Sequence, residues 1–433
     1  MGYNIFNVKQ VKPIFKTKLD AFIDSLGPAL KDGTDITFAD NDLTYSLQLQ
    51  HERLSDKGLD MDYEVYLRDA KDDVIHSNAN WRDAHYESTM CFKNVGLRRT
   101  INKDGKKVYK DNRRSVVYEI LTDVHEGTKP ENENICCPNC SAVSTIAELQ
   151  NGCPFCGTRY MMDDLFPKVT SYYFLEDVGM SGKEGKKEMV ISMIASTLVL
   201  YLIALIVNLI KLPKPITMEV IKDNLWGGIG LAFVLTIFGV VTGYIVFSFY
   251  LILRLIIVGS KEAGKIGTVG SRNAFESRMK RISPEFSFEY FTSKAVSLIK
   301  TAVFAKNEQD LLFYTGMPMD KKMKNIIDLN YGGALGLAAF QEKDGVCTAI
   351  TDVFFDVLYA DDKKVYPKRQ VFRAAFQRRT DIPINMNFSM TRIQCPTCGK
   401  SFDATKNKNC PSCGNVYNIA SDDWTLVEVK YRK

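Results

Sequence analysis

Two long apolar runs dominate the pattern of hydrophobic and polar positions along this chain of 433 residues. They cover residues 189–210 and 226–253, and neither contains Asp, Glu, Lys, Arg or His. A helix over the first run is roughly 33 Å long, enough to cross a hydrocarbon core of about 30 Å. A buried helical hairpin of a soluble protein is the alternative, but runs of this length and purity are typical of membrane spans. We therefore predict a transmembrane helical hairpin over residues 189–253.

Basic residues flank both ends of this hairpin. The connecting loop, residues 211–225, carries three lysines against two acidic residues. The outer flanks are more basic, with Lys183, Lys186 and Lys187 before the first run and Arg254, Lys261, Lys265, Arg272, Arg278, Lys280 and Arg281 after the second. The positive-inside rule therefore predicts that both arms of the chain lie in the cytoplasm.

The sequence of the N-terminal arm predicts a β-rich domain over residues 1–135 that begins with a helix. Apolar residues recur at helical spacing over 14–30. Strand-like stretches follow at residues 43–50, 63–67, 87–101 and 107–123. The last two flank Asn102-Lys-Asp-Gly105, a sequence typical of a hairpin turn. A cysteine-rich segment with one more strand occupies 136–176, and residues 177–188 form a linker to the membrane.

In the C-terminal arm, residues 254–282 are basic, contain glycines and have no apolar period, so we predict that they form a linker. A domain is predicted to follow over 283–433. Ser287 is placed to cap a helix that runs to about residue 305, with Glu289 in its first turn. Short helices are predicted at 310–314 and 321–329. The predicted strands cover residues 335–341, 346–359, 365–378 and 424–431.

Eight of the eleven cysteines form four Cys-Pro-x-Cys pairs, which is the spacing of metal ligands. Two pairs lie in each arm: Cys137, Cys140, Cys153 and Cys156 in the first, and Cys395, Cys398, Cys410 and Cys413 in the second. Four thiolates bind zinc tetrahedrally, and a site filled by four protein ligands is structural. We predict two structural zinc ions, each in a zinc ribbon with four cysteine ligands. Thiol redox chemistry is the alternative use of such pairs.

The two arms share a local pattern. Lys106-Lys-Val-Tyr109 matches Lys363-Lys-Val-Tyr366, and each begins a predicted strand. From Val108 to Cys137 is 29 positions, and from Val365 to Cys395 is 30. The N-terminal domain is therefore interpreted as a diverged repeat of the C-terminal one. The predicted fold class is α+β, with two soluble β-rich modules, each with an inserted ribbon, separated by the transmembrane hairpin.

The charge of the chain gives an expectation about its partners. The formal net charge is +5, and much of the basic excess flanks the apolar runs. Basic residues next to a membrane attract anionic lipid, at about 1 kcal/mol each. We therefore expect contact with membrane lipid and no nucleic-acid binding.

One further resemblance rests on the order of features in the last third of the chain. A helix opens with Pro284-Glu-Phe-Ser287 and is followed by the segment 307–312. Long predicted strands over 346–378 come next, and then the ribbon at 395–414 and the closing segment Asp423-Trp424-Thr-Leu-Val-Glu-Val. In this order they resemble a bacterial Tim-forty-four-like domain, whose family has the cone-shaped α+β fold of nuclear-transport-factor-two-like proteins. The resemblance implies a bacterial cell-membrane protein, and a cone cavity that binds lipid tails or a surface for translocase partners.

These expectations lead to a membrane-anchored adaptor or scaffold that binds a protein partner at the cytoplasmic face, in transport or envelope processes. The alternative is binding of lipid or another hydrophobic ligand in the cone. The alternating positions Val353, Phe355 and Val357 are uniformly apolar, so they are the expected cavity lining. We expect no enzymatic activity. Its alternative is proton transfer by the strand residues Asp352, Asp356 and Tyr359.

Overall fold

The computed structural model describes residues 9–177, 182–211, 218–361 and 364–432. Its contacts divide the chain into two compact units. The first, here called the globular unit, combines Met1–Glu176 with Lys265–Lys433. The second, the helical unit, is Asp177–Gly264. The sequence predicts two modules separated by the hairpin, whereas in the structure both arms belong to one unit.

The N-terminal half of the globular unit is a six-stranded sheet with two helices. Strands β1 (Lys9–Gln10), β3 (His76–Arg82), β4 (Tyr86–Lys103), β5 (Lys106–Val124) and β8 (Lys168–Glu176) follow this order in the sheet, and β2 (Leu59–Tyr66) also pairs with β4. The turn between β4 and β5 has positive φ at Asp104 and Gly105, as the predicted hairpin requires. Helix α1 (Pro13–Asp32) confirms the helix predicted at the start of this arm.

The strand predicted at 43–50 is wrong, because these residues lie in helix α2 (Asn41–Asp56). The Asp40 side chain caps this helix by accepting a hydrogen bond of 2.7 Å from the Leu43 amide. Leu43, Leu47 and Leu54 are buried, and their spacing of four and seven places them on one helical face. The cap and this period outweigh the local alternation that suggested a strand.

The C-terminal half contains helix α7 (Phe288–Phe304) and a four-stranded antiparallel sheet. The sheet order is β14 (Thr425–Tyr431), β11 (Val365–Arg379), β10 (Val346–Ala360) and β9 (Ile326–Lys343). Ser287 caps α7 through the Tyr290 amide, as predicted. Two short 3₁₀ helices, Glu308–Asp310 and Lys321–Asn325, precede β9, so the predicted helix at 321–329 ends earlier than expected.

The two halves share one topology. In both sheets the ribbon is inserted between the last two strands, β5 and β8 in one half and β11 and β14 in the other. Strand β2 pairs with residues 96–103 of β4, and β3 pairs with residues 87–92 on the same edge of β4. In the C-terminal half, the single strand β9 pairs with residues 346–359 of β10. The N-terminal half therefore has an interrupted strand where the C-terminal half has a continuous one.

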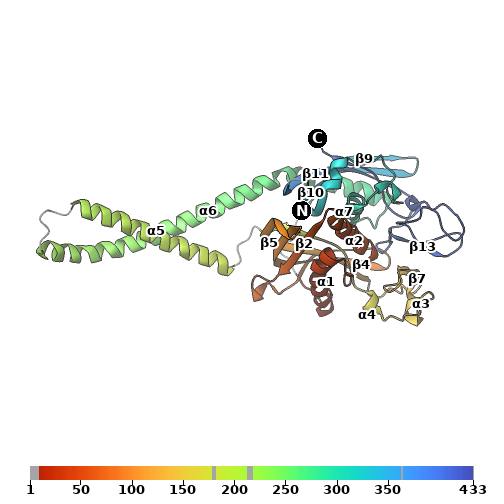
Figure 1. Cartoon of the computed structure of the whole chain (residues 1–433), viewed down its shortest axis with the longest axis horizontal. Coiled ribbons are helices and arrows are strands. Elements are labelled where there is room, and N and C mark those ends of the chain that lie inside the picture. Colours follow the sequence, from red (N-terminus) through yellow and green to blue (C-terminus); the bar gives the residue numbers. More distant parts are fainter. Residues whose placement is uncertain (1–8, 178–181, 212–217, 362–363, 433) are drawn as a thin grey trace. The chain divides into compact units, whose positions relative to one another are not determined.

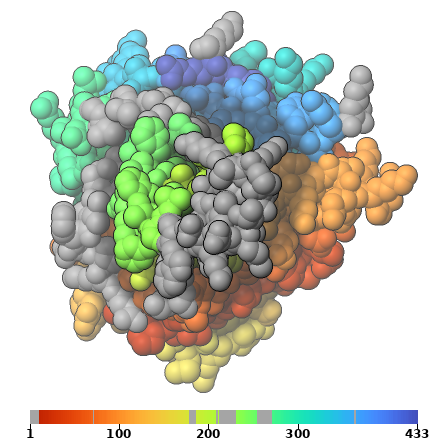
Figure 2. Space-filling view, turned by 90° about the vertical axis from the view of Figure 1, so that its left-hand side faces the viewer, coloured from red at the N-terminus to blue at the C-terminus, as the bar shows by residue number. Residues whose placement is uncertain are grey.

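Helix α7 joins the halves into one core. It contacts β9 and β14 of its own sheet and β8 of the other, and it also packs against α2. The Asn330 amide, on β9, bonds both the N–H and the carbonyl of Phe174 on β8, at 2.8 and 2.7 Å. Arg99 and Asp328 form a buried ion pair at 2.5 Å across the same boundary. In Figure 2 the orange N-terminal residues and the blue C-terminal residues meet along a continuous surface.

Residues 254–282 were expected to form a linker, but they continue helix α6 (Met218–Ile282). In its last turns Phe275 and Met279 are fully buried against the C-terminal half. Their spacing of four residues puts both side chains on one face of the helix. Packing of this face outweighs the low helix propensity of the glycines that precede it.

The helical unit consists of α5 (Gly182–Lys211) and the first part of α6. These helices contain two segments that are long and apolar enough to cross a membrane, Lys186–Val207 and Gly230–Leu253. They are antiparallel and touch at Gly239 and Gly243, where an added Cβ would come within 2.6 Å of the α-carbons of Thr197 and Met193, respectively. The Ser192 hydroxyl donates to the Gly243 carbonyl at 2.9 Å. The glycine pair thus allows close packing between the two helices of this hairpin.

One buried carboxyl in the N-terminal half gives a testable prediction. Glu119 on β5 lies next to Cys91 in the sheet and is 1 % exposed. Burial, with the nearby Asp20 charge, raises its pKa well above the usual value, and Lys93 opposes this only in part. The folded state therefore favours the protonated acid. The protonated Glu119 side chain contributes fully to stability below its pKa in the unfolded chain, which is near 4. This contribution is lost as the pH rises through the higher pKa of Glu119 in the folded protein.

Glu119→Gln is thus expected to stabilise the protein at pH 8, where the buried carboxyl disfavours its charged form, and to have little effect at pH 4. Thermal unfolding of both forms across this pH range measures the difference. Glu131→Gln, at an exposed position, is the control. An equal shift of the melting temperature at pH 4 and pH 8 would contradict this assignment.

Candidate metal centres

The four Cys-Pro-x-Cys segments adopt the same backbone turn. In each, the first cysteine N–H donates to a carbonyl five residues later, and its own carbonyl accepts from the N–H four residues later, with all eight bonds at 2.8 or 2.9 Å. The fifth residue of each turn has positive φ, and it is Ser141, Gly157, Gly399 or Gly414. Glycine adopts this conformation without strain, which explains the glycine after three of the four pairs.

Each pair of turns brings four sulfurs together. In both groups all four Sγ atoms lie within 4.8 Å of one another. Two Sγ–Sγ separations in the first group are 3.7 and 3.8 Å, and two in the second are 3.6 Å. A tetrahedron with metal–sulfur bonds of about 2.3 Å has sulfur separations of about 3.8 Å, whereas a disulfide has about 2.05 Å. The predicted cysteines are therefore grouped as expected, as thiols that could hold one metal ion in each group.

A short hairpin supports each cysteine group. The first ribbon has β6 (Asn134–Cys136) and β7 (Val143–Thr145), followed by helix α3 (Ile146–Asn151) and helix α4 (Met162–Leu165). The second has β12 (Arg392–Gln394) and β13 (Ser401–Asp403). In both, the first strand ends directly before the first cysteine of its group, so the hairpins occupy equivalent positions.

The two ribbons contact each other at one end of the globular unit (Figure 1). The Asn134 amide donates to the Gln394 side-chain carbonyl at 2.9 Å, and the Val143 N–H donates to the Ser401 hydroxyl at 3.0 Å. These contacts join residues more than 250 positions apart in the sequence. The sequence predicts each ribbon but contains no local signal for their proximity.

In each group the first cysteine of both pairs is buried and the second is exposed. The remaining cysteines, Cys91, Cys136 and Cys347, are buried and lie outside the two groups, as predicted for small core side chains. Burial raises the pKa of Cys136 and of Cys347 to about 11. These three thiols therefore stay protonated at neutral pH and are poor nucleophiles.

Val353, Phe355 and Val357, the expected cavity lining, have side chains at most 2 % exposed. They belong to the core cluster that also contains Phe372 from β11, whose ring centroid is 5.3 Å from that of Phe355. These side chains are packed in the core, and their role as the lining of a ligand cavity stays a prediction.

The three residues considered for proton transfer take part in structural contacts. Asp352 forms two hydrogen bonds with Arg373, at 2.8 and 2.9 Å, across the β10–β11 pair. Asp356 lies 3.2 Å from Arg369, and the Tyr359 hydroxyl donates to that of Tyr431 at 3.2 Å. Each of these contacts stabilises the C-terminal sheet.

Comparison of the chain with protein-family models, with curated proteins and with solved structures found no match. The resemblance of residues 283–433 to Tim-forty-four-like domains thus has no support from these comparisons and stays a prediction.

Proposed function

We propose that this protein is a membrane-anchored scaffold whose paired ribbons, each holding a zinc ion, bind a protein partner. The observation that carries the proposal is the contact between two equivalent four-cysteine ribbons on a unit whose chain is interrupted by two apolar helices.

Zinc is the proposed metal because the ligands are four thiolates at tetrahedral spacing, with no carboxylate or histidine in either group. Thiolate-only sites select soft metals, and zinc prefers a tetrahedral arrangement. Four protein ligands fill the coordination shell. The role of the metal is therefore to hold the turns together, and each site stabilises its ribbon by about 10 kcal/mol.

The anchor consists of the two candidate spans Lys186–Val207 and Gly230–Leu253. Residues before and after them form one compact unit, so the chain must return to the side from which it left. Two crossings satisfy this requirement, whereas a single crossing would separate the two halves of the core. The free thiols and the basic flanks favour the cytoplasm as the side that holds the globular unit.

Both ribbons have apolar side chains that are exposed on the surface of the globular unit. Phe155 and Met161, on the first ribbon, are 57 % and 74 % exposed, and Val416, on the second, is 70 % exposed. Large exposed apolar residues on a rigid support are typical of protein-binding surfaces. The ribbons are therefore the proposed contact with the partner.

Photo-crosslinking in native membranes tests this role. A photoreactive residue in place of Asn139, which is exposed on the first ribbon, is expected to give one dominant adduct with another protein in the full-length chain. Adding Phe155→Lys and Val416→Lys should abolish this adduct, because the charges disfavour an apolar contact. Leu67→Lys, at an apolar position 44 % exposed and outside the ribbons, is the matched control and should retain it. An adduct that survives the double substitution would exclude the ribbons as the binding surface.

A further inference from the structure

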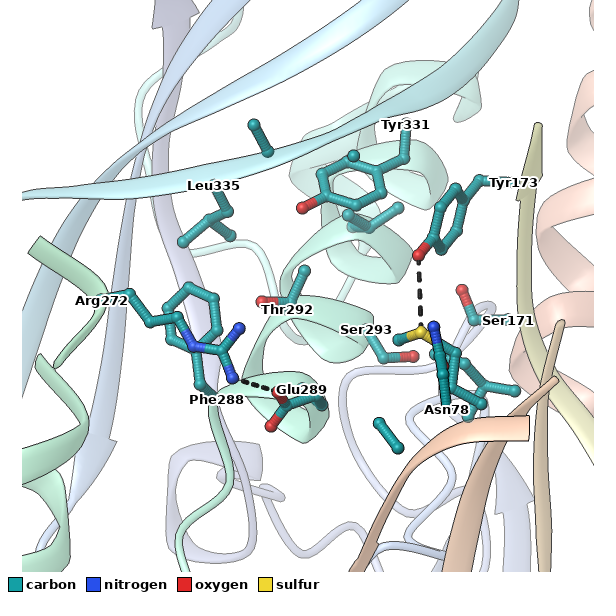
Figure 3. Close-up of a pocket in the computed structure, with 16 residues that line it drawn as sticks. Asn78, Ser171, Tyr173, Arg272, Phe288, Glu289, Thr292, Ser293, Tyr331 and Leu335 are labelled. Atoms are coloured by element: carbon teal, nitrogen blue, oxygen red, sulfur yellow. Dashed lines mark hydrogen bonds and ion pairs between the residues drawn. The ribbon is translucent and has the colours of Figure 1, made fainter. Parts of the chain in front are cut away.

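The two halves of the globular unit leave a cavity of about 120 Å³ between them. One wall comes from the N-terminal sheet, through β3, β4, β5 and β8. The other comes from α7, β9 and the end of α6 (Figure 3). The cavity lies outside both ribbons, and what we infer from it does not depend on the scaffold role.

A bulge in β9 accounts for the space. Tyr331 pairs with Phe355 and Leu335 with Val353, so β9 has three intervening residues where β10 has one. The additional residues include Gly333, with φ of 79°, and Ala334, and both line the cavity. Small side chains at a bulge cannot fill the volume between the sheet and α7.

The cavity wall is mainly apolar but contains two buried polar atoms without a partner. Its apolar surface includes Met90, Ile120, Val296 and Leu335. Within the described ranges, Oδ1 of Asn78 and Oγ1 of Thr292 are buried and have no hydrogen-bond partner. An unsatisfied buried polar atom costs about 1–3 kcal/mol, so a bound molecule that satisfies these atoms gains free energy.

The charged residues at the cavity neutralise each other. Arg272 of α6 forms an ion pair with Glu289 of α7, and its guanidinium lies 4.9 Å from the centroid of the Phe288 ring (Figure 3). A charged ligand would have to compete with this pair and lose its hydration. The charge pattern therefore favours a neutral ligand.

We propose that this cavity binds a small neutral amphiphile, consisting of one ring or a short branched chain and one hydroxyl group. The volume is close to that of an apolar cavity of about 150 Å³ known to bind benzene. The ring would contact Val296, Ile120 and Leu335, and the hydroxyl would donate to Asn78 Oδ1 and accept from the Thr292 hydroxyl. Ordered water at the two polar atoms is the competing occupant.

Three fluorinated probes test the proposal with the full-length protein in one detergent, by ¹⁹F NMR titration. We expect saturable binding of 4-fluorophenol, and about tenfold weaker binding of fluorobenzene, which lacks the hydroxyl. We expect no binding of 4-fluorobenzoate, which is charged. Equal affinity for fluorophenol and fluorobenzene, or no saturable binding of either, would overturn the proposal in favour of water in the cavity.

Two variants assign the binding to this cavity. Thr292→Val has nearly the same shape and removes one of the two proposed hydrogen bonds. It should therefore weaken fluorophenol binding part of the way towards that of fluorobenzene, since the bond to Asn78 remains, without changing the affinity for fluorobenzene. Val296→Phe fills the space and should abolish binding of both probes. Because partition into the detergent is the same for all forms, these differences report the cavity alone. Fluorophenol binding that is unchanged in both variants would place it elsewhere and refute the proposal.

Discussion

Replacing Cys153 with serine is expected to lower the metal content from two ions per chain to one and to unfold the first ribbon. Cys153 is 2 % exposed, and its sulfur lies 3.8 Å from that of Cys140 within the first group. Serine is a poor ligand for a soft metal, and loss of one thiolate removes most of the about 10 kcal/mol that a structural site contributes. Elemental analysis measures the metal, and hydrogen exchange of residues 134–165 measures the unfolding.

Cys136→Ser is the matched control for this substitution. Cys136 is the direct neighbour of the ligand Cys137, is 9 % exposed and lies outside both groups. The control should keep two metal ions, and Cys410→Ser should lose the ion of the second ribbon only. Equal metal loss from Cys136→Ser and Cys153→Ser would show that the geometric grouping of the cysteines is wrong.

Arg53→Met is expected to destabilise the globular unit by about 3 kcal/mol or more. Arg53 on α2 is 7 % exposed, and its Nη2 atom donates to the carbonyls of Val303, Phe304 and Ala305 at 2.9–3.2 Å. Its Nη1 atom donates to the Lys324 carbonyl at 3.0 Å. These groups include carbonyls at the end of α7, which have no partner within the helix. Without the guanidinium the buried carbonyls of Val303 and Phe304 lose this partner, at about 1–3 kcal/mol each, whereas the Ala305 carbonyl keeps a bond of 3.3 Å from the Lys324 ammonium.

The loss should appear as a lower melting temperature and as faster hydrogen exchange in the last turn of α7. Arg98→Met is the control, because Arg98 is 44 % exposed and pairs with Glu64 on the surface, at 2.7 Å. Such a pair contributes less than about 1 kcal/mol. Similar melting temperatures for the two variants would mean that α2 and α7 do not depend on this contact.

Local signals in the sequence were sufficient for most elements. The two apolar runs, the cysteine turns, the Ser287 cap and the Asp104–Gly105 turn each depend on residues close together in the chain, and the structure has them as predicted. Two predictions were wrong although the residues that decide them are also close together in the chain. The segment 43–50 contains both an alternating and a helical pattern, and the Asp40 cap decides for the helix. In 254–282 the spacing of Phe275 and Met279 indicates a helix in spite of the glycines.

What the sequence could not predict depends on contacts between distant residues. The union of both arms rests on pairs such as Asn330 with Phe174 and Arg99 with Asp328, which are 156 and 229 positions apart. The cavity has the same origin, because Asn78 and Thr292 come from different halves and have no distinctive sequence context.

The internal duplication stays a prediction; in both halves the ribbon lies between the last two strands of the sheet. In this view, α2 and α7 are the corresponding helices that pack against each other, and the helical unit was inserted between two copies of one module. If the halves are two copies, they differ most where β2 and β3 pair with separate parts of β4, whereas β9 is one continuous strand.

The most direct test of the central claim is native mass spectrometry of the full-length protein, extracted gently from its membrane with metal-free buffers. We expect the mass of the chain plus two zinc ions, with both ions lost together with cooperative structure when a strong chelator is added. A chain with no bound metal, or with disulfides within the two cysteine groups, would contradict the account of two metal-stabilised ribbons.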